Sequence, residues 1–349
     1  MRLGDIARES RGTYKGDKTD IPIVGLEHLV SGELKFSEYE LNTDNTFNKC
    51  FHKGQILFGR RRAYLKKAAV AEFDGICSGD ITVIEAIPGK VDERLLPFII
   101  QNDRLFDFAV SRSAGGLSPR VKWEHLADYE LELPSIEEQR VLAEKLWAAY
   151  ELKEAYKKMI VATDEMVKSQ FIEMFKNESL QVPLEKIVEV KDDCRKPINE
   201  GERSEMKEGD LYPYYGATGI VDYINDYITD EELLCIAEDC GNYKAGEESA
   251  YIIRGKAWVN NHAHLVKVKD SCDIKYLYYY LKITNLVPYV SGTTRLKLTQ
   301  KKLKEILVTL PSAELQNRFV AIAQQADKSK FELRQAIDKI DKVMKSLLQ

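Results

Sequence analysis

Residues 133–140 read LPSIEEQR, and residues 310–318 read LPSAELQNR. The two stretches begin 177 residues apart (310 minus 133), which is about half of the 349-residue chain. Self-similarity at a fixed spacing is the signature of a repeated structural unit. The same spacing aligns Val121 with Leu298, and a spacing of 181 aligns VDERLLPFII (91–100) with CDIKYLYYYL (272–281). The sequence therefore predicts two copies of one design.

The composition is typical of a soluble globular protein, with 44% apolar and 31% charged residues. The chain is long enough for two domains. Its six cysteines form no CxxC pair, so we expect reduced, mostly buried thiols rather than disulfides or a zinc site. No apolar run has the length of a membrane span, and the opening MRLGDIARES lacks the apolar core of a signal peptide. We expect a cytoplasmic protein with no membrane contact.

Each copy divides into a strand-rich part and a helical part. Short apolar runs broken by Gly, Asn and Asp predict strands, namely GQILFGR (54–60), DITVIEA (80–86), LLCIAED (233–239) and AHLVKVK (263–269). One helix is expected near the end of each strand-rich part, over 92–103 and 273–284. The predicted fold is α+β, with two mixed, largely β domains, each followed by a long helix. The expected divisions are a first domain 1–134, a central helical spacer 135–176, a second domain 177–310 and a C-terminal helical spacer 311–349.

The two helical parts carry the most regular pattern in the sequence. Their apolar residues are separated alternately by four and three positions, which is the heptad pattern of a coiled coil. The residues expected to pair the two helices are Leu146, Tyr156, Ile160, Val167, Leu333, Ile337, Ile340, Met344 and Leu347. Lys153 and Lys330 occupy matching places in the two patterns. The alternative is that each helix simply packs on the core of its own domain.

The starts of the two helices differ in one residue. Ser135 followed by Glu138 predicts a capping box, in which the serine hydroxyl and the glutamate carboxylate satisfy backbone N–H groups reciprocally. The second copy has Leu315 in place of the glutamate. We therefore expect a weaker cap on the second helix.

Together these features resemble the DNA specificity (S) subunits of Type I restriction-modification systems. The resemblance covers essentially the whole chain and rests on LPSIEEQRVLAEKL (133–146) with its echo from residue 310, KGQILFGRRRAYLKKAAVAEFDGICSGD (53–80), YPYYGATGIVDYI (212–224) and GKAWVNNHAHLVKV (255–268). It implies two target recognition domains whose spacers pair antiparallel with pseudo-twofold symmetry, each domain reading one half of a split double-stranded DNA target. It also implies two methyltransferase subunits and restriction (translocase) subunits as partners, with S-adenosylmethionine, ATP and Mg²⁺ bound by those partners and no cofactor on this chain.

Basic side chains gather at one place in the first domain. Residues 1–134 contain 19 basic and 21 acidic side chains, so a basic cluster there is a local exception. Guanidinium groups suit phosphates and the edge of guanine, and the candidate DNA contacts in this cluster are Arg60, Arg61, Arg62, Tyr64, Lys66 and Lys67. If the arginines continue a strand, Arg60 and Arg62 share one face. The alternative is that the run is only a solvated face.

Two glycine-bearing loops occupy matching places in the copies, SRSAGGLSPRVK (111–122) and SGTTRLK (291–297). Glycine lets a backbone approach a phosphate closely, and the candidate donors are Arg112, Arg120, Lys122, Thr293, Thr294, Arg295 and Lys297. A plain connecting turn is the alternative.

The second domain has a further group of polar and aromatic candidates. An asparagine side chain can pair with the edge of adenine, and a tyrosine ring can stack. The candidates are Tyr214, Tyr215, Asn260, Asn261 and His262.

Catalytic motifs are missing from the sequence. There is no GxxxxGK[ST] phosphate loop, no GxGxxG, no [DNS]PP[YF] tetrapeptide and no convincing nuclease carboxylate set. His262 and His264 with Glu238 or Asp239 would suit a metal, but a structural role for one histidine is the better interpretation, and no metal is expected. We predict a non-catalytic specificity subunit. The alternatives are an interaction or scaffold protein whose two domains cap a coiled coil without reading bases, and a fused methyltransferase or nuclease.

Overall fold

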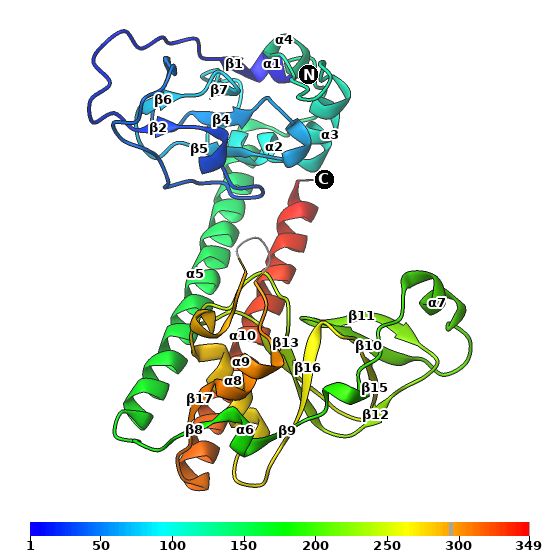
Figure 1. Cartoon of the computed structure of the whole chain (residues 1–349). Coiled ribbons are helices and arrows are strands. Elements are labelled where there is room, and N and C mark those ends of the chain that lie inside the picture. The colour runs from blue at the N-terminus through cyan, green and yellow to red at the C-terminus, as the bar shows by residue number, and fades with distance from the viewer. Residues whose placement is uncertain (293–295, 349) are drawn as a thin grey trace. The chain divides into compact units, whose positions relative to one another are not determined.

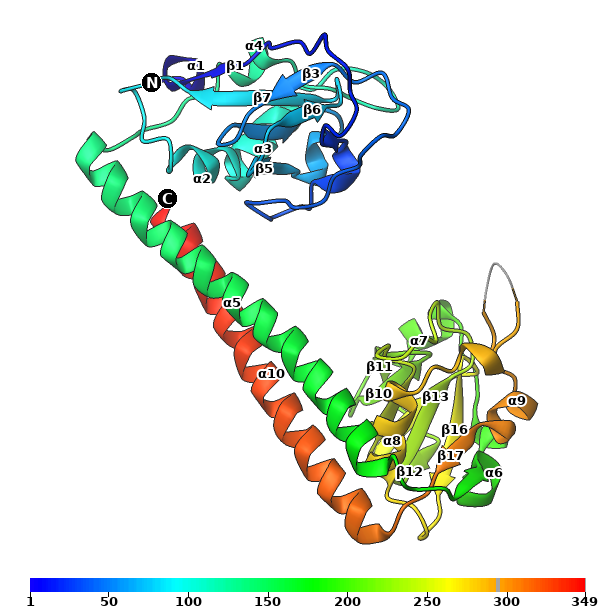
Figure 2. The same cartoon turned by 90° about the vertical axis from the view of Figure 1, so that its left-hand side faces the viewer.

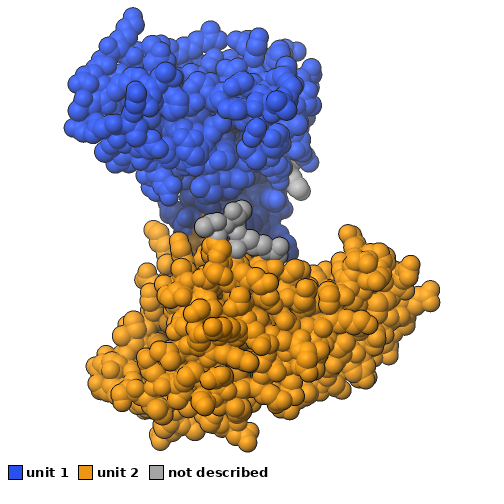
Figure 3. Space-filling model, in the orientation of Figure 1, with its two compact units in different colours: residues 1–155, 336–349 blue, residues 156–335 orange. Residues whose placement is uncertain are grey.

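The computed structural model describes residues 1–292 and 296–348. The chain forms two compact units, unit 1 with residues 1–155 and 336–349, and unit 2 with residues 156–335 (Figure 3). Each unit thus combines one strand-rich domain with segments of both long helices. Within the described residues, no helix has the length and apolar character needed to span a membrane.

Unit 1 is built on a four-stranded antiparallel sheet (Figure 1). The strand order is β1-β7-β4-β5, with β1 at Ala7–Glu9, β7 at Ile81–Ala86, β4 at Ile56–Gly59 and β5 at Ala68–Val70. All four residues of β4 are buried, as are the first four of β7, because apolar side chains cover both faces of these central strands. The strands predicted from GQILFGR and DITVIEA are confirmed as β4 and β7.

A second, three-stranded sheet completes the domain of unit 1. Its order is β2-β6-β3, with β2 at Ile23–Val24, β6 at Gly75–Cys77 and β3 at Lys49–Phe51. The short helices are α1 (Leu3–Ile6), α2 (Leu96–Ile100), α3 (Asp103–Ser111) and α4 (Trp123–Leu126), with 3-10 turns η1 (Leu26–His28) and η2 (Ala63–Leu65). The single helix expected over 92–103 is wrong in its bounds. It is shorter, and a separate helix starts after Asn102, whose side chain accepts the Arg104 N–H as an N-cap.

Unit 2 repeats the main sheet of unit 1. Its order is β14-β13-β16-β9, all antiparallel, with β14 at Ala250–Ile253, β13 at Leu233–Ala237, β16 at Ala263–Val268 and β9 at Val188–Val190. Strand for strand this corresponds to β5-β4-β7-β1. The internal repeat predicted from the sequence therefore extends to sheet topology, and the predicted strands LLCIAED and AHLVKVK are confirmed as β13 and β16.

The remaining elements of unit 2 show where the copies diverge. A second sheet of four strands has the order β11-β10-β15-β12, with β11 at Gly219–Ile224, β10 at Tyr212–Gly216, β15 at Lys256–Val259 and β12 at Thr229–Asp230, and a small pair joins β17 (Leu307–Thr309) to β8 (Gln181–Pro183). The short helices are α6 (Leu184–Ile187), α7 (Glu200–Glu205), α8 (Ile274–Ile283) and α9 (Gln300–Glu305), with 3-10 turns η3 (Asp192–Cys194) and η4 (Val287–Tyr289). The helix expected over 273–284 is confirmed as α8.

The two long helices are α5 (Ile136–Phe175) and α10 (Ala313–Leu347). The capping box on the first is present, since the Ser135 N–H donates to the Glu138 carboxylate at 2.9 Å and the Glu138 N–H donates to the Ser135 hydroxyl at 3.4 Å. On the second helix the Leu315 N–H donates to the Ser312 hydroxyl at 3.4 Å, with no side chain reaching back. The weaker second cap follows from that leucine.

Within each unit, segments of α5 and α10 lie side by side and run antiparallel (Figure 2). In unit 2, Val167 of α5 shares a core with Phe319 and Ala323 of α10. In unit 1, Leu146 of α5 shares a core with Met344 of α10. All nine residues expected to pair the helices are buried or half-buried.

One ion pair in each unit marks the repeat within the paired helices. In unit 1 the Lys153 ammonium lies 2.7 Å from the Asp341 carboxylate, and in unit 2 the Lys330 ammonium lies 2.5 Å from the Asp164 carboxylate. Each lysine and each aspartate has its counterpart 177 residues away. Burial alone would lower the pKa of Lys330, but its hydrogen bonds and charge contacts with Asp164 and Asp327 raise it above its ordinary value. The lysine is therefore held charged inside the pairing.

A buried glutamine explains the repeated phrase. The Gln139 side chain accepts the Asp92 N–H at 3.0 Å and donates to the Pro134 carbonyl at 2.9 Å. Gln316 does the same, accepting the Asp273 N–H at 2.8 Å and donating to the Pro311 carbonyl at 2.9 Å. Both glutamines are at most 3% exposed. Each one ties the start of a spacer helix to the start of the helical segment in its own domain.

Candidate nucleic-acid interface

The loop of the first domain is a closed hairpin. Ala114 and Arg120 exchange two backbone hydrogen bonds, of 3.0 and 2.9 Å. The base of the hairpin lies beside the end of β4, because Arg61 forms a backbone bridge with Arg120 and the Val121 N–H donates to the Arg60 carbonyl at 3.0 Å. The glycine-bearing loop and the arginine cluster, which the sequence nominates separately, therefore form one surface.

The loop of the second domain is closed in the same way. Ser291 and Lys297 exchange two backbone hydrogen bonds, of 3.0 and 2.8 Å, at positions 177 residues beyond Ala114 and Arg120. The predicted contacts Thr293, Thr294 and Arg295 lie outside the described residues. Lys297 is exposed, and its ammonium lies 2.9 Å from the Glu238 carboxylate.

The expected alternation of the arginines along a strand is wrong. β4 ends at Gly59, and the chain then turns sharply, since Arg62 has a left-handed φ of 53° and begins a 3-10 turn. Arg60 and Arg61 are half-buried, and Arg62 is exposed. The Nε atoms of Arg60 and Arg61 are buried without a hydrogen-bond partner in the described part of the chain. Arg62 is thus the arginine of this run that is best placed to meet a ligand.

Asp80 holds two of the basic side chains in place. The Arg61 guanidinium lies 3.2 Å and the Arg120 guanidinium 2.7 Å from its carboxylate, and Arg61 also donates to the Ser118 hydroxyl at 3.0 Å. Burial alone would raise the pKa of Asp80, but hydrogen bonds and charge contacts with Arg120 and Arg61 lower it. This clamp orients the loop and neutralises part of its positive charge.

The other first-domain candidates divide into anchors and free groups. Lys67 donates to the Leu26 carbonyl at 2.7 Å, and Lys66 lies 2.7 Å from the Asp103 carboxylate. The hydrogen bond to Asp103 raises the pKa of Lys66. The Arg112 guanidinium lies over the Phe108 ring, 5.3 Å from its centroid, and its side chain is exposed, as are those of Tyr64 and Lys122. Lys67 is therefore a structural residue, whereas the exposed three stay available to a ligand.

Two second-domain candidates belong to the packing of unit 2. Tyr214 is 2% exposed, and its hydroxyl accepts the Ile198 N–H at 3.1 Å. Asn260 is 8% exposed, and its side-chain oxygen accepts the His262 N–H at 2.8 Å. The structure places both in the interior rather than on a surface that meets DNA. The alternation of the strand explains this, because β10 turns Tyr214 inward.

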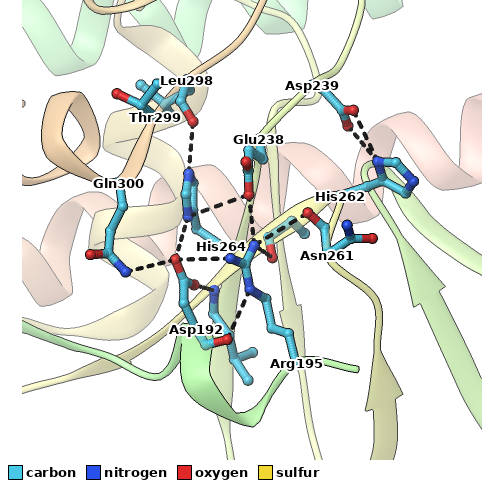
Figure 4. A network of polar contacts seen from close by, with 12 residues as sticks. Asp192, Arg195, Glu238, Asp239, Asn261, His262, His264, Leu298, Thr299 and Gln300 are labelled. Atoms are coloured by element: carbon cyan, nitrogen blue, oxygen red, sulfur yellow. Dashed lines mark hydrogen bonds and ion pairs between the residues drawn. The ribbon is translucent and has the colours of Figure 1, made fainter. Parts of the chain in front are cut away.

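The remaining second-domain candidates reach the surface. Tyr215 is half-buried and stacks on Tyr251 with ring centroids 5.4 Å apart. Asn261 is exposed, and a ring nitrogen of the half-buried His262 lies 2.9 Å from the Asp239 carboxylate (Figure 4). Tyrosine and asparagine are both side chains that can contact bases, so Tyr215 and Asn261 stay candidates.

His264 is the centre of a buried polar network (Figure 4). Its side chain is 1% exposed, with Nδ1 2.7 Å from an Asp192 carboxylate oxygen and Nε2 2.7 Å from the Leu298 carbonyl. Both neighbours are hydrogen-bond acceptors, so a protein oxygen already lies against each ring nitrogen. In the described part of the chain, no group of three or more His, Cys, Asp or Glu residues is arranged to hold a metal.

The network connects His264 to the base of the second loop. The Arg195 guanidinium lies 3.2 Å from Asp192 and 2.8 Å from Glu238, whose other oxygen meets Lys297 at 2.9 Å. Burial alone would raise the pKa of Asp192, but hydrogen bonds and charge from His264, with the Leu265 N–H, lower it. The network braces the base of the second loop at Lys297 and Leu298. Sequence reasoning missed Asp192 and Arg195, since a lone turn carries no periodic signal.

The model for the Type I restriction modification DNA specificity domain matches residues 1–160 and again residues 178–342. The chain belongs to this family. One relative is a putative type I restriction enzyme specificity subunit of Haemophilus influenzae, which is 35% identical over 40% of this chain and 35% of the relative. Another is the EcoprrI specificity subunit of Escherichia coli, which is 29% identical over 35% of this chain and 29% of the relative. The matched segments thus span about a third of each relative.

Solved structures share the fold of this Type I specificity chain along its whole length. The S subunit of M. genitalium, known from a crystal structure, aligns with a TM-score of 0.58 and 16% identity, covering 100% of this chain and 95% of that one. A chain from a study of type I R-M system assembly aligns with a TM-score of 0.59 and 18% identity, covering 100% and 95%. At these identities the likeness shows the fold alone.

Proposed function

We propose that this chain is the DNA-reading subunit of a Type I restriction-modification complex, with one recognition domain for each half of a split double-stranded target. The observation that carries the proposal is that the specificity domain occurs twice, over residues 1–160 and 178–342. Each copy presents a hairpin loop closed between equivalent residues and carrying a basic side chain at its base. A chain that reads one continuous site has no need of two such surfaces.

The proposal includes partners, because the chain is poorly suited to hold DNA alone. Its formal charge is −5, and Asp80 and Glu238 neutralise part of the charge at both loops. Phosphate neutralisation dominates affinity for DNA. We therefore expect weak, poorly selective binding by the isolated chain and tight, selective binding once two methyltransferase subunits join, with restriction subunits attaching to that complex.

The outer face of α5 supports the presence of further protein around the spacer. A second apolar series, also separated by four and three residues, stays exposed, with Leu152, Met159 and Met166 at 45%, 52% and 45% exposure. Its members are Ala148, Leu152, Ala155, Met159, Ala162 and Met166. An exposed apolar stripe at heptad spacing fits a partner helix.

Catalysis is assigned to the partners under this proposal. The chain has no GxxxxGK[ST] phosphate loop, no GxGxxG and no [DNS]PP[YF] tetrapeptide. Those cofactors and Mg²⁺ would then act on the partner subunits, in the cytoplasm where the DNA lies. Equilibrium binding of S-adenosylmethionine to the isolated chain tests this directly, and saturable binding would contradict it.

The experiment that tests the DNA-reading function is a selection from random duplexes by the complex of this chain with its methyltransferase subunits. The expected product is two short blocks of fixed letters separated by a fixed number of free positions. A single continuous block would contradict the assignment of one domain to each half-site. A selection with no enriched motif would favour the scaffold alternative.

A change in spacer length tests the same proposal geometrically. Three heptads inserted at facing positions of α5 and α10, between the two ion pairs, add about 21 residues and about 31 Å to each helix. This approaches one duplex turn of about 34–36 Å, so the second half-site stays on the same face of the DNA. We expect unchanged letters and a gap wider by about nine or ten base pairs. One heptad inserted into each helix would widen the gap by only about three base pairs. The second half-site would then lie on a different face of the duplex, so recognition should fail.

A further inference from the structure

Leu117 has the most exposed large apolar side chain among the described residues. It is 98% exposed, at the tip of the hairpin loop that Ala114 and Arg120 close. The next most exposed large apolar residue reaches only 59%. Exposure of a whole leucine gains nothing for the folded domain, since burial of such a side chain contributes about 1.5–3 kcal/mol. The chain therefore holds it in solvent without a partner of its own.

The loop presents Leu117 from a braced frame. On its C-terminal side, the Arg62 N–H donates to the Pro119 carbonyl at 2.8 Å and Arg61 donates to the Ser118 hydroxyl at 3.0 Å. On its N-terminal side, Gly115 has a φ of 118°, which a residue with a side chain rarely adopts. No atom lies within 4 Å of where a Gly116 side chain would begin. The leucine consequently stands clear of its neighbours.

The charges around Leu117 identify what it meets. The stretch from 108 to 123 contains Arg112, Arg120 and Lys122 and no acidic residue, and the exposed Arg62 joins them through its contact with Pro119. An apolar tip within a cationic rim suits duplex DNA, because the rim meets phosphates while the tip reaches apolar base surface. Apolar side chains contact bases either at an opened base step or at the thymine methyl group.

We propose that Leu117 is a specificity-determining residue of the first recognition domain, whose side chain packs against the apolar surface of bases in one half-site. The inference rests on the proposed DNA-reading function. Arg62 and Arg112 hold the backbone of the duplex, Arg120 stays paired with Asp80 at the base of the loop, and the braced loop places the leucine in the groove. Little ordering of the protein is then needed at binding, since the loop is already closed.

The test compares Leu117→Ala with Leu117→Met in the complex with methyltransferase subunits. The alanine variant should bind the selected duplex about 10- to 100-fold more weakly, as expected for loss of a buried leucine, with binding to random duplexes unchanged. The methionine variant should retain most of the affinity. Leu180→Ala removes another exposed leucine, 56% exposed, and should leave binding unaltered. Thermal unfolding of all variants should match the parent.

Two further arms identify the base surface. A 2-aminopurine placed along the first half-site should brighten at one step with the parent and not with Leu117→Ala if the leucine opens that step. Replacement of thymine by deoxyuracil should weaken only the parent if the leucine meets a methyl group. If Leu117→Ala bound the selected duplex as tightly as the parent and selected the same half-site letters, the inference would be overturned. The DNA-reading function would still stand if the parent selected a bipartite motif. Loss of methyltransferase assembly instead would overturn it by showing a protein contact.

Discussion

Replacement of the buried glutamine at the start of the first spacer should loosen one domain from its helix. In Gln139→Ala, the Asp92 N–H and the Pro134 carbonyl lose partners that lie at 3.0 and 2.9 Å. A buried donor or acceptor left without a partner costs about 1–3 kcal/mol, and water can replace the lost partner at the exposed Pro134, though less easily at the half-buried Asp92. We expect a net loss of about 1–3 kcal/mol from this anchor.

Amide hydrogen exchange measures that loss where it occurs. A cost of about 2 kcal/mol corresponds to about 30-fold faster exchange at the Asp92 amide. Gln316→Ala should accelerate exchange at the Asp273 amide by a similar factor, because its contacts match. Each variant should leave the other domain unchanged, and Arg140→Ala, at an exposed neighbouring position, should change neither. Less than about a twofold change at Asp92 would refute the anchoring role.

Three other outcomes follow from the ion pairs and the arginine cluster. The pKa of Asp192 is lowered from its ordinary 3.8, so its contribution to stability is complete above that value and is lost as the pH falls through the lower folded pKa. Asp192→Asn should therefore weaken the decrease in the free energy of unfolding of unit 2 at acid pH, measured by urea unfolding. Lys330→Asp should destabilise unit 2 by about 1–3 kcal/mol, and the exchanged pair with Asp164→Lys should recover part of the loss in a double-mutant cycle. Arg62→Ala should relax selection at one half-site only, and equal relaxation of both would show that the arginine contacts phosphates without reading bases.

The sequence contains enough periodic information to predict the architecture. The heptad spacing predicts α5 and α10, because one helix face must be apolar wherever two helices pair. The central strands β4, β7, β13 and β16 are predicted because they are short apolar runs bounded by turns. The second sheet of unit 2 could not be predicted, since Tyr212–Gly216 pairs with Lys256–Val259 far along the chain and Gly219–Ile224 joins the sheet only through Tyr212–Gly216.

The candidate interface is predictable in composition but less so in geometry. The basic cluster and the two loops are nominated from residue types alone, and the structure brings Arg61 and Arg120 together. The sharp turn at Arg62 has no local signal, because a left-handed arginine depends on the contacts around it. The burial of Tyr214 and Asn260 follows from strand orientation, which the letters YYG and VNN do not contain.

The positions that the two copies share explain why the phrase is written twice. Gln139 and Gln316 fix a helix to its domain, and the Lys153 and Lys330 ion pairs fix one helix against the other. These contacts depend on geometry common to both halves, so a change at either place disturbs the frame. The second sheets differ between the two units in strand number and order, and the sequences of the two loops differ as well, with Thr294 at the position that corresponds to Leu117. A frame that stays constant while its surfaces vary is what two domains require if each is to read different DNA letters.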